Sequence, residues 1–540
     1  MLSILRKPDA VYGATDASDF RFEEHLTNDV KYDYIVEGNS AKVVVYPSGS
    51  PVKYLKLRFR GDLTDVDKVF GDQWERVGHG LPSTYVEWKT IMPFRPLPWF
   101  CYLIRGGRMD CYGVKTGADA FVFFQVDHDG ITLFINLCSG NVGVDLQAPL
   151  IACEVIQREG AAGEDPYKVA QTFAGQLCEK PVLPKTPIFG VNNWYWAYGN
   201  ISHDIVMQET EQLTRLTAGC KHSPYMIIDD GWQVSHEDTD CKIGPIGPWV
   251  PNSRFPDLKH TSAEIHRQGA KAGLWIRPLY TTQRPDDAEM ILVEGDGVYT
   301  LDPSHPKTLQ LAEETARRIT QEWGFDLIKH DFSVIDTTGI NNFAAETFHS
   351  QLCRENRTFF DKTKTTATVL KNLYAAIQRG AGDKDVIGCG TIGHLTAGIH
   401  SIFRTGADTS GRCYEWTRRD GGNCLMRLPL NNAFYMTDPD CASFTDMVPF
   451  QANLEFLEMC ALTRQTVLAS IRPGILTEEQ MLQVNKVFRL ADEGVHRYGI
   501  KNFDKTSCPE QFISADGKTE KRFHWSDSYD GSRMALTWYD

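Results

Sequence analysis

Asp331 closes a short apolar run, residues 327–332, in which Lys329 precedes it by two positions. Residues two apart point to the same side of a strand, so a buried parallel strand would bring both charges to one edge of a sheet. Two other segments, 227–232 and 402–408, also pass from apolar residues to carboxylates. Carboxylates beside cations and flat aromatic rings are the groups that cleave glycosidic bonds and hold sugars.

Other polar and aromatic side chains stand where further apolar runs end. Taken singly, each has an ordinary structural explanation, because an Asp often caps a turn and a Trp usually belongs to a core. Their joint occurrence at successive strand ends favours a site. The set contains no zinc-ligand spacing, nucleophile elbow or P-loop, so neither a metal nor a cofactor is expected. Its members are Trp194, Trp196, Asp229, Asp230, Trp232, Arg277, Lys329, Asp331, Cys389, Arg404, Asp408, Asp438 and Asp440.

Eight apolar runs alternate with helical patterns in the middle of the chain. This number and spacing predict a (β/α)8 barrel, in which the C-terminal strand ends form the active face. The connection between the fifth and sixth runs is short, so its helix should be reduced to a turn or two. The runs are 188–194, 225–232, 272–278, 325–332, 386–390, 402–408, 434–440 and 466–471.

The barrel, expected over residues 181–490, lies between two β-rich parts. Residues 1–180 show the alternation and turn signals of an N-terminal β-sandwich. Residues 491–540 contain no long helical pattern and predict a small C-terminal β-domain. Its expected strands are 512–515, 521–525 and 534–539.

The overall composition limits the partners. A net charge of −14 over 540 residues argues against nucleic acid. No stretch reaches the ~18 apolar residues of a membrane span. The N-terminus lacks the apolar core of a signal peptide, and the 14 cysteines form no Cys-x-x-Cys pair, which favours a cytoplasmic location. A homo-oligomer is left open.

A nicotinamide-dependent oxidoreductase is the alternative from a different class. Residues 388–393 fit Gly-x-Gly-x-x-Gly after a strand, with Asp408 twenty positions beyond Gly388. Residues 394–400 are then all that separates the last glycine from the next strand. That segment is too short for the usual crossover helix, which disfavours a dinucleotide site.

Several segments resemble the α-galactosidases of the melibiase and raffinose-synthase family, within the larger clan of retaining (β/α)8 α-glycosidases. The resemblance covers roughly residues 189–440. His330 and the 388–400 segment depart from the family pattern, which leaves the exact sugar open. The matching motifs are residues 190–199, Asp229-Asp230-Gly231-Trp232-Gln233, Lys329-His330-Asp331 and Arg404-Thr405-Gly406-Ala407-Asp408.

The resemblance implies a role for each matched residue. Asp331 would be the nucleophile and Asp408 the general acid/base. Asp229, Asp230 and Lys329 would hydrogen-bond O3, O4 and O6 of the sugar. Cys389 and Arg404 would lie near O2, and Trp194 and Trp232 would form the pocket wall. Arg277 is expected to contact substrate because of its strand-end position.

The activity that follows is a retaining exo-hydrolase that releases terminal α-linked galactose from an oligosaccharide or glycoside by double displacement. Lys329 should favour the ionised form of Asp331. Arg404 should point at substrate or at another carboxylate, since a guanidinium beside Asp408 would favour loss of the acid proton. A raffinose-synthase-type transglycosylase, an α-N-acetylgalactosaminidase and a β-L-arabinopyranosidase remain alternatives.

Overall fold

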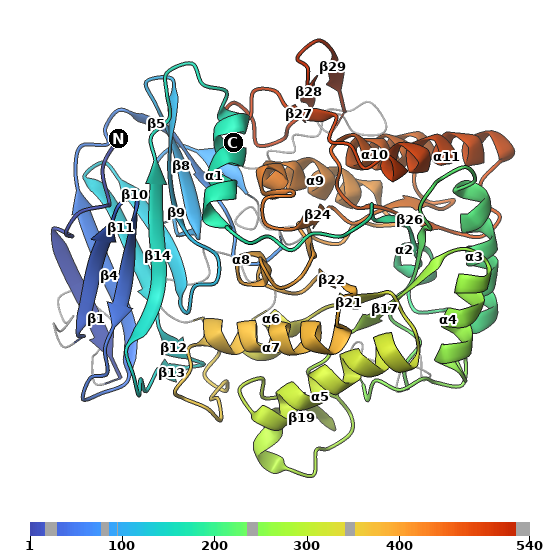
Figure 1. Cartoon of the computed structure of the whole chain (residues 1–540), viewed down its shortest axis with the longest axis horizontal. Coiled ribbons are helices and arrows are strands. Elements are labelled where there is room, and N and C mark those ends of the chain that lie inside the picture. The colour runs from blue at the N-terminus through green and yellow to red at the C-terminus, as the bar shows by residue number, and fades with distance from the viewer. Residues whose placement is uncertain (17–29, 77–85, 94, 235–246, 341–351, 525–540) are drawn as a thin grey trace.

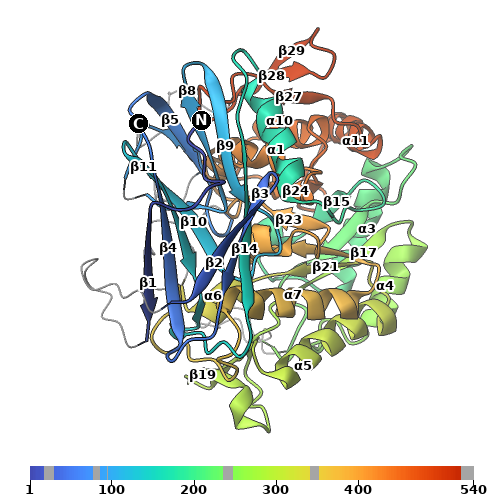
Figure 2. The same ribbon diagram turned by 60° about the vertical axis from the view of Figure 1, so that its left-hand side comes forward.

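The computed structural model describes residues 1–16, 30–76, 86–93, 95–234, 247–340 and 352–524 (Figure 1). Two antiparallel sheets form its N-terminal part (Figure 2). One has the order β1 (Ala10–Thr15), β4 (Val52–Arg60), β11 (Gly130–Asn136), β10 (Phe121–Asp127), β7 (Leu97–Pro98). The other has the order β2 (Tyr32–Glu37), β3 (Ser40–Val45), β14 (Leu150–Arg158), β9 (Arg108–Val114), β8 (Phe100–Arg105), β5 (Val66–Gly71), β6 (Glu87–Lys89).

Both N-terminal sheets bury alternate residues, as expected for strands with one face on a core. Leu55, Leu57 and Phe59 of β4 are fully buried, and so are Val43 and Val45 of β3. All five belong to one apolar cluster. A small pair of strands, β12 (Cys138–Ser139) and β13 (Val142–Gly143), follows β11.

A parallel sheet forms the centre of the molecule. Eight of its nine strands overlap the eight predicted runs, so the coarse expectation of a barrel-type domain is confirmed. Its order is β24 (Met436–Asp438), β23 (Ile402–Arg404), β22 (Asp385–Gly388), β21 (Leu327–His330), β17 (Lys271–Ile276), β16 (Tyr225–Ile228), β15 (Phe189–Asn192), β26 (Val467–Ile471), β25 (Cys441–Phe444).

The two edge strands of this sheet are consecutive in the chain. Only Pro439 and Asp440 separate β24 from β25, so β24 pairs with β23 while β25 pairs with β26. The amide of Thr466, just before β26, donates to the carbonyl of Thr437 in β24 at 3.0 Å. The seventh predicted run, 434–440, contains β24 but not β25, and the sheet closes on itself through this pair of consecutive strands.

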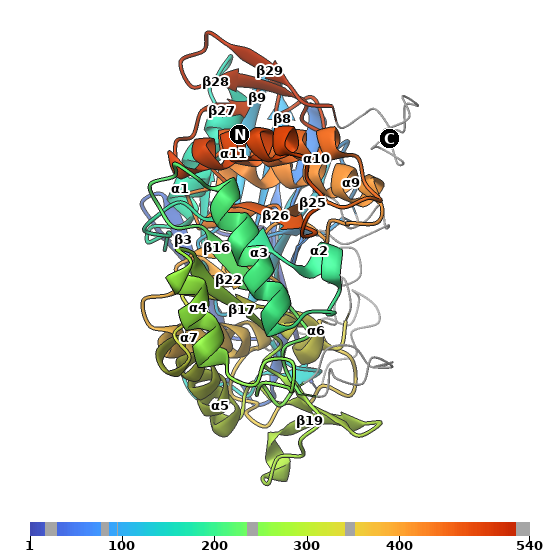
Figure 3. The same cartoon turned by 90° about the vertical axis from the view of Figure 1, so that its right-hand side faces the viewer.

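Helices cover the outside of this sheet, and Figure 3 shows α3, α4, α10 and α11 on the side away from the N-terminal sheets. α5 packs along α7. The connection between β22 and β23 holds the four-residue α8, which confirms the expected reduction. The helices are α2 (Trp194–Ala197), α3 (His203–Leu216), α4 (Leu258–Arg267), α5 (Pro306–Arg317), α6 (Ser333–Thr338), α7 (Thr366–Ala381), α8 (Gly393–Thr396), α9 (Tyr414–Cys424), α10 (Phe450–Leu462) and α11 (Glu478–Asp492).

The N-terminal sheets and the barrel are joined by buried contacts. α1 (Pro166–Leu177) packs against β9 and against the short helix η6 (Leu425–Leu430) of the barrel. Trp99 stacks on His394 of α8, with ring centroids 4.6 Å apart. The N-terminal part therefore covers the flank where the barrel lacks a full helix (Figure 1).

Two small sheets complete the described part. β18 (Tyr280–Thr281), β20 (Val298–Leu301) and β19 (Ile291–Gly295) form an insertion after β17. β27 (Tyr498–Ile500), β28 (Gln511–Ser514) and β29 (Glu520–Arg522) form the C-terminal sheet. The strand expected at 534–539 lies outside the described residues. Of the helices in the described ranges, none is long and apolar enough to cross a membrane.

Candidate active site

Asp331 lies directly after β21, buried to 6% exposure. Its Oδ1 accepts from the backbone N–H of Phe332 at 2.8 Å, and its Oδ2 accepts from the Trp275 indole N–H at 3.2 Å. Phe332 has a positive φ of 64°, which turns the chain from the strand into α6. A Cβ on Gly390 of the neighbouring strand end would lie 2.7 Å from Asp331 Oδ1, so glycine there leaves room for the carboxylate.

Lys329 and Asp229 form a buried pair at the ends of β21 and β16. Lys329 Nζ donates to Asp229 Oδ2 at 2.7 Å, and Asn192 Nδ2 donates to the same oxygen at 2.6 Å. Burial lowers the pKa of Lys329, but the Asp229 carboxylate and other neighbours raise it more, so the net pKa is above its usual value. We expected Lys329 to support Asp331. In the structure its ammonium group reaches across the sheet and pairs with Asp229.

Asp230 stands next to this pair and is almost fully buried. Gln233 Nε2 donates to its Oδ1 at 2.6 Å. Burial, reinforced by the charge of Asp229, raises the pKa of Asp230 to about 7. Near neutral pH this carboxyl group can therefore donate as well as accept a hydrogen bond, which suits a sugar hydroxyl.

Asp408 follows β23 and is more open than these residues, with a side chain 39% exposed. Its Oδ1 accepts from Arg404 Nη2 at 2.9 Å and from Arg76 Nη1 at 2.9 Å. The expectation that Arg404 points at another carboxylate is met by its contact with Asp440. The expectation that it leaves Asp408 alone is wrong, because one guanidinium reaches both carboxylates.

Arg76 comes from the N-terminal part and reaches the strand ends of the barrel. The nitrogen that contacts Asp408 also lies 3.4 Å from the Sγ of fully buried Cys389. Cys389 precedes Gly390, which is in contact range of Asp331. Contacts through Arg76 and Cys389 thus link the residues around Asp408 to those around Asp331. Sequence reasoning missed Arg76, since no motif marks a residue so far from the barrel.

Asp440, in the break between β24 and β25, organises the same corner. Its Oδ2 accepts from the Tyr195 hydroxyl, from Arg404, and from the backbone N–H of Thr409 at 2.9 Å. Thr409 follows Asp408, so Asp440 fixes the backbone beside the candidate acid/base. The sequence placed Asp440 among the strand-end residues but gave it no role.

Three predicted substrate contacts have different surroundings. Arg277 forms a two-bond ion pair with Asp336 at 2.6 and 3.0 Å and stacks over Tyr280 and Phe332, so its charge is already engaged. Trp232 has no exposed surface and donates its indole N–H to the carbonyl of Trp275, which places it in the core and not on a pocket wall. Trp194 is partly exposed beside Tyr198 and remains available to a ligand.

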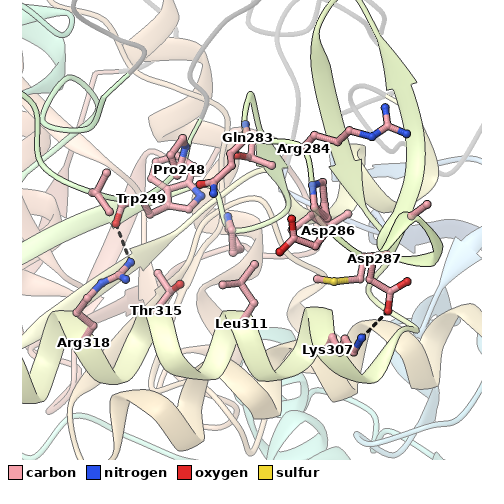
Figure 4. Close-up of a pocket in the computed structure, with 17 residues that line it drawn as sticks. Pro248, Trp249, Gln283, Arg284, Asp286, Asp287, Lys307, Leu311, Thr315 and Arg318 are labelled. Carbon is pink, nitrogen blue, oxygen red and sulfur yellow. Dashed lines mark hydrogen bonds and ion pairs between the residues drawn. The ribbon is translucent and has the colours of Figure 1, made fainter.

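A separate hollow of about 780 Å³ lies between the β18–β20–β19 insertion and α5 (Figure 4). Trp249 and Arg318 line one end, and Asp287, paired with Lys307 at 2.7 Å, lines the other. None of the strand-end carboxylates described above borders it.

Within the described residues, one group brings metal-type ligand atoms together, formed by Asp287, Glu289 and His305. Asp287 already pairs with Lys307, and His305 Nδ1 accepts from the Lys307 amide at 3.2 Å. A helix cap and an ion pair account for this cluster, so it gives no support for a bound metal.

A closed parallel sheet with carboxylates and cations at its C-terminal strand ends is the arrangement of a barrel enzyme. No family model matches the chain. Two curated relatives do: α-galactosidase Mel36A of Lactobacillus acidophilus, 30% identical over 118 residues, and α-galactosidase 1 of Pediococcus pentosaceus, 26% identical over 190 residues. The matches cover 21% and 31% of this chain, and 15% and 23% of the relatives' own lengths.

Solved α-galactosidases share the fold over most of the chain. TtGalA from Thermus thermophilus, in complex with p-nitrophenyl α-D-galactopyranoside, has a TM-score of 0.59 at 16% identity and covers 91% of this chain and 99% of its own. The GH36 α-galactosidase AgaA from Geobacillus stearothermophilus has a TM-score of 0.57 at 14% identity, covering 94% and 77%. The resemblance to α-galactosidases that the motifs indicated is thus matched by similarity of local sequence and of fold.

Proposed function

We propose that this protein is a retaining exo-glycoside hydrolase that releases terminal α-linked galactose, or a related sugar with an axial O4, from an oligosaccharide or glycoside. The proposal rests on the placement of Asp331 and Asp408 at the same end of the barrel. Contacts of Arg76 and Cys389 link the residues around one carboxyl group to those around the other. The similarity to proteins named α-galactosidases supports the sugar.

In the first step, the Asp331 carboxylate attacks the anomeric carbon while the bond to the leaving oxygen breaks. Asp408 gives its proton to that oxygen. In the second step, Asp408 takes a proton from water, and the water oxygen displaces Asp331 from the anomeric carbon. Two inversions at one carbon retain the α configuration. The mechanism needs the two carboxyl groups about 5–5.5 Å apart around the sugar.

The pair of Lys329 and Asp229, with Asp230, forms the candidate clamp for the sugar hydroxyls. Lys329 supplies a donor, Asp229 an acceptor, and Asp230 either, because its pKa is raised to about 7. Such mixed groups fix the direction of each hydroxyl and therefore distinguish an axial from an equatorial O4. Trp194, at the end of β15, would offer a flat apolar surface to the sugar ring.

The domain organisation belongs to the same proposal. It comprises an N-terminal β-sandwich over 1–180, the catalytic (β/α)8 barrel over 181–490 and a small C-terminal β-domain over 491–540. Alternate burial along strands of both N-terminal sheets, whose buried residues join one apolar cluster that also extends into the barrel, supports the sandwich. The cytoplasmic location stays a prediction, and the free thiols of the described cysteines agree with it.

A panel of nitrophenyl glycosides tests the activity, with and without a disaccharide acceptor. We expect cleavage of the α-galactoside above all others, with α-N-acetylgalactosaminide and β-L-arabinopyranoside as the nearest competitors. Sugar transfer to the acceptor in place of release to water would identify a transglycosylase. Early NMR spectra should show the α-anomer first, and a β-anomer at that stage would refute retention.

Two substitutions test the catalytic pair. Asp331→Ala should abolish turnover of every substrate, since it removes the carboxylate that attacks the anomeric carbon. Asp408→Ala should lower the rate on natural oligosaccharides far more than on nitrophenyl glycosides, because a good leaving group needs little acid assistance. Wild-type activity in Asp331→Ala would remove the assignment of the nucleophile.

A further inference from the structure

The segment that delivers Arg76 is fixed to the barrel by one buried arginine. Arg427 of η6 donates to Asp72 Oδ1 at 2.8 Å and to the carbonyl of Glu75 at 2.7 Å. Another of its nitrogens donates to the carbonyl of Thr405 at 3.0 Å. The chain just before Arg76 is therefore attached to the strand end that carries Asp408.

Arg76 reaches Asp408, the candidate acid/base, from the N-terminal part of the chain. In a retaining glycosidase the acid/base faces the leaving oxygen, and Asp331 faces the anomeric carbon. Arg76 is 19% exposed and bonds the more open carboxyl group. Among the described residues, Arg76 lies within ion-pair distance of Asp408 at 2.9 Å and Glu75 at 3.8 Å, and it also interacts electrostatically with Asp331.

Several charged or titratable groups face Asp408. Arg404 contacts the same carboxylate oxygen from β23, and its second carboxylate neighbour is Asp440. Tyr195 of α2 interacts electrostatically with Asp408, and Cys389 interacts with both arginines. Arg404 is also bonded to buried Asp440, whereas Arg76 is partly exposed and contacts Cys389 besides Asp408, so Arg76 is the cation at Asp408 chosen for replacement.

Resting on the proposed function, we infer that Arg76 is a positioning residue that favours the ionised form of Asp408 and so assists its role as base in the second step. A cation within hydrogen-bond distance stabilises a carboxylate over the protonated acid. The same contact opposes the first step, in which Asp408 must hold a proton. The N-terminal part of the chain thereby sets the balance between the two steps.

The test compares Arg76→Met, which removes the charge, with Arg76→Lys, which keeps it. In Arg76→Met, the basic limb of kcat/KM against pH for an α-galactosyl disaccharide should move up by about one pH unit. The acidic limb of the rate constant of the second step, measured with the nitrophenyl α-galactoside after the burst of nitrophenol from the first step, should move up equally. Arg76→Lys should move both limbs much less.

Arg105→Met is the matched control, because Arg105 also lies in the N-terminal part and pairs with exposed Asp65 at 2.8 Å. It should leave both limbs in place. A uniform loss of rate in Arg76→Met with unmoved limbs would overturn the inference and reduce Arg76 to a structural contact.

A readout without activity separates this inference from the proposed function. The difference in melting temperature between wild type and Arg76→Met should stay constant from pH 7 to about pH 5 and shrink as the pH falls below about 4, the ordinary range of an Asp carboxyl group, because protonation of Asp408 then removes the ion pair in wild type. In an Asp408→Asn background that pH dependence should vanish. Its persistence there would contradict the pairing, whereas an inactive wild type with the expected melting behaviour would contradict the proposed hydrolase alone.

Discussion

At the scale of single residues, the site depends on one position that must be occupied by glycine. Gly390 faces Asp331, and a Cβ there would lie 2.2 Å from the Phe332 amide nitrogen and 2.7 Å from Asp331 Oδ1. The first of these atoms is backbone and cannot rotate away. The carboxylate and its amide donor therefore keep their geometry only with glycine opposite them.

Gly390→Ala should reduce turnover of the nitrophenyl α-galactoside by about a hundredfold, because a displacement of the nucleophile of about 1 Å costs that much. Gly49→Ala is the control, since nothing lies within 4 Å of its added Cβ. Steady-state kinetics and melting curves of both variants check this. Full activity in Gly390→Ala would show that Asp331 does not need this space.

Asp440 is the second residue whose loss should be costly. Replacement by Ala leaves Arg404 buried without its main counter-ion, which should lower the free energy of unfolding by about 3–5 kcal/mol. Asp446→Ala, which breaks an exposed pair with Arg472, should change it by less than about 1 kcal/mol. Urea unfolding measures both, and equal effects would refute the role given to Asp440.

At the scale of elements, α2 and α3 are joined through a buried acid. Glu209 of α3 is 3% exposed and accepts from Trp196 Nε1 at 2.7 Å and from Asn193 Nδ2 at 3.1 Å. Asn193 in turn accepts from the Asp229 amide at 3.0 Å. Burial raises the pKa of Glu209 from 4.5 to about 7. The packing of two helices is thus connected to the candidate sugar clamp.

Glu209 should make the protein less stable as the pH rises. The folded protein keeps a proton that the unfolded chain releases above about pH 4.5, so this contribution is complete below that pH and lost as the pH rises through about 7. The difference is on the order of 3 kcal/mol. Urea unfolding at pH 5 and pH 7.5 should show a smaller decline in Glu209→Gln than in wild type.

Glu211→Gln is the control for this measurement, because Glu211 is exposed on the same helix. It should retain the wild-type decline between the two pH values. A decline that is the same in Glu209→Gln and in Glu211→Gln would mean that Glu209 does not carry the effect.

The order of these elements could be predicted, because apolar runs and the spaces between them depend on local sequence. The eight runs and the reduced helix after β22 were found in this way. The break at Asp440 could not be predicted from the sequence. Its positive φ of 78° arises where the chain passes from β24, which pairs with β23, to β25, which pairs with β26. Lys329 was matched with Asp331 by strand parity, but its long side chain reaches Asp229 on another strand.

Contacts between distant parts were hidden from sequence reasoning. Arg76 carries no motif, and its partners lie in the barrel. Arg277 was expected to contact substrate because it follows a strand, but in the structure its guanidinium is paired with Asp336 of α6. Spacing identifies which residues reach the strand ends. It does not show which of them are already paired there.

At the scale of the whole molecule, the pair of Arg427 and Asp72 holds the N-terminal part on the barrel. Both side chains are buried. Arg427→Met should lower the free energy of unfolding by about 3–5 kcal/mol, because Asp72 would stay buried without a counter-ion. Activity should also fall, since Arg76 depends on the same segment.

The double variant Asp72→Leu with Arg427→Met should recover part of the lost stability, because it leaves no unpaired charge. Arg215→Met is the control, as it breaks an exposed pair with Glu478. Differential scanning calorimetry checks all three. If Arg427→Met were as stable as Arg215→Met, this ion pair would not secure the interface.

The stacking of Trp99 on His394 has a consequence for how the chain is made. The flank of the barrel at α8 lacks a full helix, and residues much nearer the N-terminus shield it. Those residues leave the ribosome first, and domains generally fold as units during synthesis. The folded N-terminal part can then cover this flank as soon as β22 and β23 are synthesised. A circular permutant that moved this region behind the barrel would expose the flank during translation and should aggregate more in the cell.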